Sequence, residues 1–142
     1  MRFATITALF AAGALAAPAP QAQATSGEVI AVSDFSVRKT VDNTPTNVNF
    51  KINGGAASNL TCTLDNPAVP NSAVTKCGDS AYSFALVKGT AADYAVRLYK
   101  ELGPGVGLYG QGDVFTYCHT GGLGDLLCSQ VAPAAIAIDG SA

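Results

Sequence analysis

The sequence of 142 residues contains no tryptophan and a single histidine, and only 13% of its residues are charged. A glycosidase groove is usually lined with aromatic platforms, so the absence of tryptophan counts against that class of enzyme. The formal net charge is −2 and there is no run of Lys or Arg, which argues against binding to nucleic acid or anionic membranes. One imidazole, with four cysteines that are expected to pair in disulfides, is too small a ligand set for a metal ion.

The first residues have the pattern of a secretory signal peptide. Arg2 supplies a positive charge, and residues 6–17 form an apolar, Ala-rich run that is too short to span a bilayer. Residues 14–16 and 22–24 each form an A-x-A cleavage site. We therefore expect a secreted, extracellular protein with no integral membrane segment. The predicted divisions are a signal peptide over 1–16, with cleavage at 24 as the later alternative, a disordered tail over 17–27 and a single β-barrel domain over 28–142.

The four cysteines are expected to form two disulfides, because a secreted chain folds in an oxidising compartment and none is left over. Three pairings are possible on paper. The local pairing, Cys62 with Cys77 and Cys118 with Cys128, is favoured because it closes two short loops, each of which stabilises by about 2–3 kcal/mol in a chain-entropy model. The spacing fits neither C-x-x-C redox chemistry nor a zinc ribbon, so we interpret both bonds as structural.

From residue 28 onward the chain has the pattern of many short strands and is nowhere convincingly helical. Val48, Phe50 and Ile52 alternate with polar neighbours, which places them on one face of a strand. Residues 92–101 would suit a helix by composition, but they also keep a period of two, and we predict a strand there. Frequent turn residues between such runs are typical of an all-β protein that folds as a sandwich or a barrel. The predicted strands cover 28–32, 35–39, 47–52, 59–64, 82–86, 92–101, 108–109, 114–118 and 131–138, and Leu126 and Leu127 are expected to lead into a further strand.

One short motif resembles a catalytic motif. Gly78, Asp79 and Ser80 resemble the nucleophile motif of one group of lipases and esterases, and such a serine requires a histidine base. The only candidate is His119, which follows Cys118 and precedes a glycine-rich turn, with no aspartate shortly before it. A turn beside a disulfide accounts for the same residues. We therefore predict no enzyme, no cofactor and no metal site, and keep a cell-wall hydrolase that uses Ser80 and His119 as the last of three hypotheses.

Two further features are candidates for modification and recognition. Asn59 begins the one N-glycosylation sequon, although it lies in a predicted strand close to Cys62. Arg38 and Lys39 form a rare adjacent basic pair in a chain that is poor in charge, and they are our first recognition candidates. The simpler alternative is that they are the solvated end of a strand.

The order of several short motifs resembles the family of the major allergen of Alternaria and its fungal relatives. The likeness covers about residues 29 to 138, and its most specific part is the pair of cysteine loops. Within the family, the length and the signal peptide resemble those of secreted elicitors that induce the hypersensitive response. The matching motifs are Val37-Arg38-Lys39, Val48-x-Phe50-x-Ile52, Leu60-x-Cys62, Cys77-Gly78, Tyr117-Cys118-x-x-Gly121-Gly122 and Cys128.

The resemblance implies an antiparallel β-barrel with both local disulfides, acting outside the fungal cell, in the plant apoplast, as an elicitor or effector that affects virulence and defence. The implied partners are plant cell-surface or apoplastic proteins, with a thaumatin-like pathogenesis-related protein as one candidate. The second hypothesis is a carrier of small phenolic or other apolar ligands, with which relatives have been connected. The allergen carries an additional cysteine that links two barrels. Residues 25–28 of this chain contain none, so a covalent dimer is not expected.

Overall fold

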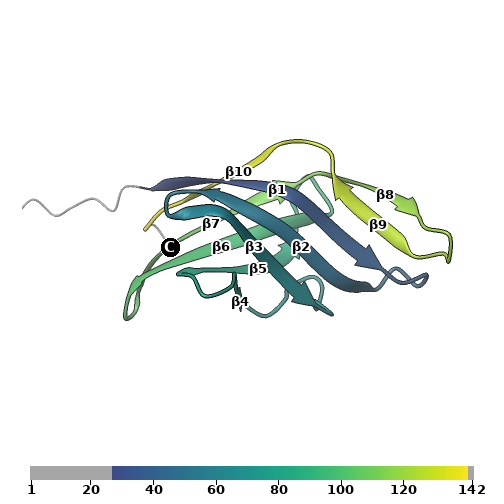
Figure 1. Ribbon diagram of the computed structural model, residues 1–142, viewed down its shortest axis with the longest axis horizontal. Helices are drawn as coiled ribbons and strands as arrows, with labels where there is room; N and C mark the ends of the chain where they lie inside the picture. The colour runs from purple at the N-terminus through teal and green to yellow at the C-terminus, as the bar shows by residue number, and fades with distance from the viewer. Residues whose placement is uncertain (1–26, 141–142) are drawn as a thin grey trace, which may run out of the picture.

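The computed structural model describes residues 27–140, which form two antiparallel β-sheets packed around a shared core (Figure 1). The predicted signal peptide over 1–16 and nearly all of the predicted tail lie outside the described residues. The described residues contain no helix, and hence no helix that could cross a membrane. The strands are β1 (Glu28–Lys39), β2 (Pro45–Gly54), β3 (Ala57–Asp65), β4 (Thr75–Lys76), β5 (Tyr82–Lys88), β6 (Tyr94–Gly103), β7 (Val106–Val114), β8 (Thr116–Thr120), β9 (Leu126–Gln130) and β10 (Ala134–Ile138).

The larger sheet has the strand order β3-β2-β1-β9-β8, and β10 also pairs with β1. The smaller sheet has the order β4-β5-β6-β7. β1 contacts three neighbours because it is long: residues 28–32 pair with β10, residues 36–39 pair with β9, and β2 runs along its other side. All of these pairings are antiparallel, and the predicted all-β antiparallel fold is confirmed.

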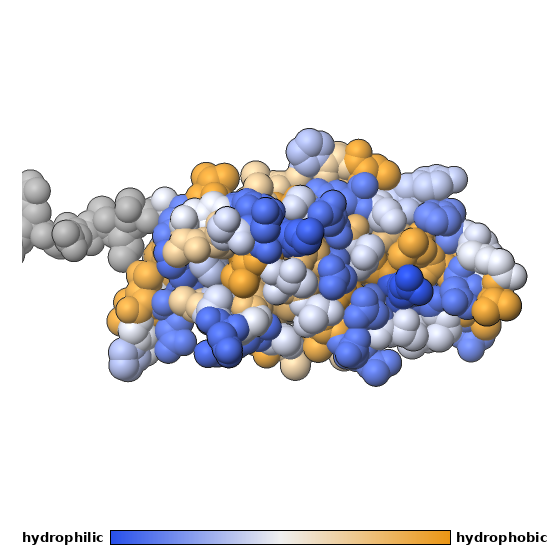
Figure 2. Space-filling view, viewed as in Figure 1, coloured by the Kyte–Doolittle hydropathy of each residue, from blue (hydrophilic) through white to orange (hydrophobic). Residues whose placement is uncertain are grey.

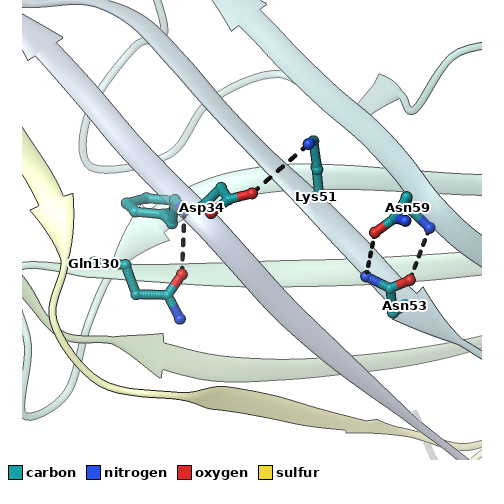
Figure 3. Close-up of polar contacts among 6 residues, drawn as sticks. Asp34, Lys51, Asn53, Asn59 and Gln130 are labelled. Carbon is teal, nitrogen blue, oxygen red and sulfur yellow. Dashed lines mark hydrogen bonds and ion pairs between the residues drawn. The ribbon is translucent and has the colours of Figure 1, made fainter.

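A bulge divides β1 into these two halves. Asp34 has a left-handed backbone, with φ of 53°, and the inward positions change there from Val32 to Phe35, a step of three residues. The alternation pattern predicts two strands with a break at 33–34, but the structure joins them into one. The side chain of Gln130 bridges the bulge. Its Oε1 accepts from the Phe35 N–H at 3.1 Å (Figure 3), and its Nε2 donates to the Val32 carbonyl at 2.9 Å.

Large apolar side chains fill the space between the sheets. Phe50 lies between Phe35 and Phe84, with ring centroids 5.8 Å and 4.8 Å away. Removal of such side chains from water is the main stabilising term of a core of this kind. The alternating residues of β2, β5 and β6 that the sequence places inward are buried: Val48, Phe50, Ile52, Tyr82, Phe84, Leu86, Tyr94, Val96 and Leu98.

β7 and β10 bring the edges of the two sheets together. Tyr109 and Asp139 exchange two backbone hydrogen bonds, of 2.9 Å and 3.1 Å. Next to this bridge the strands approach so closely that a Cβ on Gly110 would overlap the carbonyl oxygen of Ala137. In the sequence, Gly110 and Gly112 predict a break between two short strands, 108–109 and 114–118. Instead they allow the close approach of two backbones, and β7 continues through them.

We call the end of the barrel that carries the β2–β3 and β6–β7 turns the turn end, and a polar network joins the two sheets there. Lys100 of β6 donates a hydrogen bond to the carboxylate of Glu28 in β1, and the Tyr82 hydroxyl donates to its other oxygen at 3.1 Å. The same hydroxyl accepts from the Ala56 N–H at 3.1 Å. The bond from Lys100 lowers the pKa of Glu28, and it raises the pKa of Lys100. Both groups therefore stay charged at neutral pH.

Candidate functional site

The opposite end, which we call the loop end, carries the connections 40–44, 66–74, 89–93 and 121–125. In Figure 1 it is the right-hand end, where β1 ends and the β8–β9 hairpin extends. A hollow of about 470 Å³ lies between the β1–β2 and β8–β9 connections. Arg38, Lys39, His119 and Asp125 all line it, so the structure brings the two recognition candidates next to the histidine.

Arg38 and Lys39 nevertheless leave the strand on opposite faces, because successive residues of a strand alternate. Arg38 is exposed on the outer face, opposite Leu127 of β9, which in turn lies opposite His119 of β8. The Lys39 Nζ lies 5.1 Å from the ring centroid of Tyr94, toward the smaller sheet. Over the ends of β1 and β9, Figure 2 shows hydrophobic surface directly beside strongly hydrophilic surface. The basic pair thus divides into an exposed arginine and a lysine held against an aromatic ring.

The Cys118–Cys128 disulfide fixes the hairpin that carries His119. The two cysteines lie directly opposite each other in β8 and β9, with Cα atoms 3.9 Å apart. At the tip, Gly124 has φ of 85°, and an added Cβ would lie only 2.8 Å from the Val41 Cγ1. The two connections that border the hollow are therefore held against each other, and the glycine-rich turn has a packing role.

The second disulfide lies in the core and connects the two sheets. Cys62 of β3 and Cys77, which follows β4, both have no exposed surface. The two disulfides join cysteines that are 15 and 10 residues apart in the sequence. They therefore have the local pairing that the predicted fold includes. These bonds use all four cysteines of the chain.

Asp113, at the end of β7, holds the 89–93 connection in place. Its carboxylate oxygens accept hydrogen bonds from the N–H groups of Ala91 at 2.6 Å and Thr90 at 2.9 Å. These backbone bonds lower the pKa of Asp113. A charged carboxylate thus orders one of the four connections of the loop end.

Ser80 and His119 lie in different parts of the molecule. Ser80 precedes β5 in the smaller sheet, where its hydroxyl donates to the Cys77 carbonyl at 2.6 Å and accepts from the Tyr82 N–H at 3.1 Å. His119 lies on β8 of the larger sheet, at the loop end. Ser80 therefore stabilises a turn, as the structural interpretation of the motif predicts. Within residues 27–140, no group of three or more His, Cys, Asp or Glu side chains is placed to hold a metal ion.

Asn59 is exposed on β3, and its backbone is left-handed with φ of 44°. Its N–H donates to the Asn53 Oδ1 at 2.7 Å, and its own Oδ1 accepts from the Asn53 Nδ2 at 3.2 Å (Figure 3). These bonds fix the asparagine at the turn end of the larger sheet. Glycosylation there stays a prediction.

A larger hollow, of about 710 Å³, lies on the outer face of the smaller sheet and is not predicted by the sequence. Tyr99 of β6 and Tyr109 of β7 lie directly opposite each other, and their rings stack with centroids 5.9 Å apart. Val74 and Val106, which are 58% and 56% exposed, also line the hollow. Figure 2 shows apolar surface near the β6–β7 turn. The period of two does place both tyrosines outward, but only the strand register sets them side by side.

Comparison with known proteins gives concordant results for family and fold. The model of the family described as Alternaria alternata allergen 1 matches residues 32–128. The effector protein PevD1 of Verticillium dahliae is 46% identical over 142 residues, which cover 96% of this chain and 91% of that protein. The same protein from strain VdLs.17 gives the same values.

Among solved structures, two crystal structures of the Alternaria alternata major allergen Alt a 1 match the fold. One has a TM-score of 0.65 at 21% identity and covers 78% of this chain and 86% of that chain. The other has a TM-score of 0.62 at 24% identity, with coverage of 78% and 91%. At these identities the likeness shows the shared fold, and it agrees with the barrel described above.

Proposed function

The chain belongs to the Alternaria alternata allergen 1 family, and on this premise we propose that it is a secreted fungal effector that acts on plant tissue. The observation that carries the proposal is the 46% identity with the effector protein PevD1, which extends over 96% of this chain. We propose that plant cells recognise the folded protein and respond with the hypersensitive response and defence. In this proposal the protein acts by binding and does not catalyse a reaction.

The loop end is the surface that we propose for recognition. Connections on a rigid scaffold are where binding residues concentrate, and here two disulfides and the carboxylate of Asp113 hold that scaffold. Arg38 and His119 are exposed on one face of the larger sheet, and Asp125 lies beside them in the same hollow. Such a surface can form charge-assisted hydrogen bonds with acidic and basic groups of a partner.

The proposed partner is a plant cell-surface or apoplastic protein, with a thaumatin-like pathogenesis-related protein as the first to test. The experiment is infiltration of the purified, disulfide-intact chain into leaves, beside a reduced and alkylated control. The intact chain should trigger an oxidative burst and cell death, and the control should not. If neither form acts at micromolar dose, the effector proposal is wrong.

Point variants then test the surface. Arg38→Ala and His119→Ala should each weaken the leaf response at least about tenfold, as expected for central interface residues. Lys76→Ala, which removes an exposed charge from the smaller sheet, is the matched control and should respond as the parent does. All three should keep the parent's thermal midpoint. Full activity of both loop-end variants would show that the recognised surface lies elsewhere.

A specific observation favours a second candidate function, a carrier of small phenolic ligands. The stacked Tyr99 and Tyr109 form an apolar, aromatic wall in the hollow of about 710 Å³. Titration with a flavonoid should quench tyrosine emission, and Tyr109→Ala should abolish the quenching. Tyr117→Ala, a change at an exposed tyrosine of the larger sheet, should not. A flat titration of the parent chain would rule this candidate out.

A further inference from the structure

β8 forms an open edge of the larger sheet, because the strand order ends with it. Figure 1 shows β8 on the rim of that sheet. The other edge strands of the two sheets are bridged, cross-linked to the other sheet or very short. β7 is bridged to β10 through Tyr109 and Asp139, and β3 is tied to the smaller sheet by the disulfide of Cys62. β4 is an edge of only two residues. Very short edges, and edges tied to the other sheet, are protected against pairing with another chain. The Cys118–Cys128 disulfide of β8 runs inward to β9, so it leaves the outer edge of this five-residue strand open.

The register of the β8–β9 hairpin shows which backbone groups of β8 point outward. The Gly121 N–H donates to the Asp125 carbonyl, and the Val131 N–H donates to the Phe115 carbonyl. Hydrogen-bonded and non-hydrogen-bonded positions alternate along an antiparallel pair, so residues 117 and 119 also direct their backbone groups toward β9. The N–H and C=O groups of the intervening residues point away from β9, toward the open edge. These residues are Thr116, Cys118 and Thr120.

The composition of β8 makes this edge able to pair. The strand reads Thr-Tyr-Cys-His-Thr, without Lys, Arg, Asp, Glu or Pro, the residues that commonly block edge strands. Apolar side chains around it are open to solvent: Tyr117 is 68% exposed, Val131 63% and Phe115 47%. A strand with exposed aromatic groups and no formal charge is an unusual edge for a secreted monomer.

We propose that β8 pairs with β8 of a second copy of the chain, antiparallel about a twofold axis at Cys118. In this register Thr116 lies opposite Thr120 of the second copy, and Tyr117 lies opposite its His119. The outward groups of the three residues then form about six backbone hydrogen bonds between the copies. Because the strand carries no Lys, Arg, Asp or Glu, pairing with itself places none of these charges opposite a like charge, and a twofold interface requires this self-complementarity.

The dimer joins two larger sheets into one continuous sheet, without a disulfide between the copies. Its interface is small, a strand of five residues with the flanking apolar side chains, so its dissociation constant should lie in the micromolar range or above. The loop-end hollow of each copy lies next to the pairing strand, since His119 belongs to both. This inference is independent of the proposed function, because it concerns the chain with itself.

Sedimentation equilibrium of the disulfide-intact chain, from about 10 µM to about 1 mM, tests the proposal. The parent chain should show a reversible monomer–dimer equilibrium. Thr120→Pro removes an outward N–H without removing a bond to β9, and Tyr117→Lys adds a charge on each copy at the seam. Each variant should raise the dissociation constant at least tenfold. Ser58→Lys, which adds the same charge at an exposed position of β3, should leave it unchanged.

Amide hydrogen exchange by NMR supplies a second readout on the parent chain. As the concentration rises, the amides of Thr116, Cys118 and Thr120 should gain protection, while those of Tyr117 and His119 are protected throughout by β9. A chain that stays monomeric at about 1 mM would overturn the proposal. So would a dimer that both β8 variants leave intact, or one whose new protection lies outside β8. Pairing of β8 with an extended segment of a different protein by a chain that never self-associates would also overturn it.

Discussion

The two ends of the barrel use the same larger sheet in different ways. In the half near the turn end, β1 pairs with β10, which approaches β7 and joins the two sheets. In the half near the loop end, β1 pairs with β9, and β9 carries β8, whose outer edge is free (Figure 1). The change occurs at the bulge of Asp34, bridged by Gln130. The bulge in β1 therefore separates two halves of the larger sheet: one is joined to the smaller sheet through β10, and the other ends in the open edge strand β8.

The two ends also place their charges differently. At the turn end, the side chains of Lys100 and Glu28 are only 13% and 24% exposed, and Tyr82 bonds the same carboxylate. At the loop end, Arg38 and His119 are exposed. Exposed charges contribute little to stability, whereas partly buried pairs with additional hydrogen bonds contribute more. The difference suggests that stability and recognition are assigned to opposite ends, and the following predictions examine that division.

The largest effect is expected at the seam between β7 and β10. Gly110→Ala places a Cβ on the carbonyl oxygen of Ala137, so either the sheets separate or the backbone shifts. We expect a loss of about 3 kcal/mol or more in the free energy of unfolding, measured by urea denaturation. Gly103→Ala is the matched control, because a Cβ there meets nothing within 4 Å. Equal stability of the two variants would mean that the close approach of β7 and β10 does not contribute to the joining of the two sheets.

The next effect is expected in the polar network of the turn end. Lys100→Met keeps the length of the side chain and leaves the Glu28 carboxylate without its cation, which should cost about 1–3 kcal/mol. Lys51→Met is the control, because Lys51 pairs with Asp34 at 3.7 Å while 44% exposed (Figure 3). That change should cost less than about 0.5 kcal/mol. Similar losses in the two variants would contradict the unequal roles of the two ion pairs.

The same network should make stability depend on pH. The pKa of Glu28 is lowered in the folded state, so its contribution is present above the unfolded pKa and is lost as pH falls through the folded pKa. The pKa of Lys100 is raised, so its contribution is present below the unfolded pKa and is lost as pH rises through the folded pKa. Between about pH 7 and about pH 3 the parent should therefore lose more thermal stability than Lys100→Met. Parallel melting curves for the two chains would contradict this assignment.

Much of the fold follows from local pattern. The alternation of Val48, Phe50 and Ile52 predicts one buried face, and all three are fully buried. The same period of two correctly predicts a strand for most of residues 92–101, in spite of its helix-forming composition. Burial on one face of a sheet repeats every second residue, so the pattern is readable within a few residues of sequence.

What the sequence does not predict depends on contacts between distant residues. Gly110 lies in a glycine-rich segment with the composition of a turn. Only the neighbouring Ala137 backbone explains why this glycine lies within a strand. Gln130 is 98 residues from the Val32 carbonyl that it bonds, and no short motif marks it. Arg38 and His119 are both visible as unusual residues, yet their shared row across β9 appears only in the register. The same holds for the Tyr99–Tyr109 stack, which requires β6 to pair with β7.

The smallest effect is expected at the loop end, where Lys39 lies over the ring of Tyr94. Lys39→Met removes the cation and should lower the free energy of unfolding by about 0.5–1 kcal/mol, because a cation above an aromatic face is modestly stabilised at a half-exposed site. Lys39→Arg should recover most of the loss, since a guanidinium also stacks on aromatic rings. Lys88→Met, at an exposed position of the same end, should be neutral. If urea denaturation showed a loss for Lys39→Met as large as for Lys100→Met, both ends would support the fold equally, and the loop end would not be free to serve recognition.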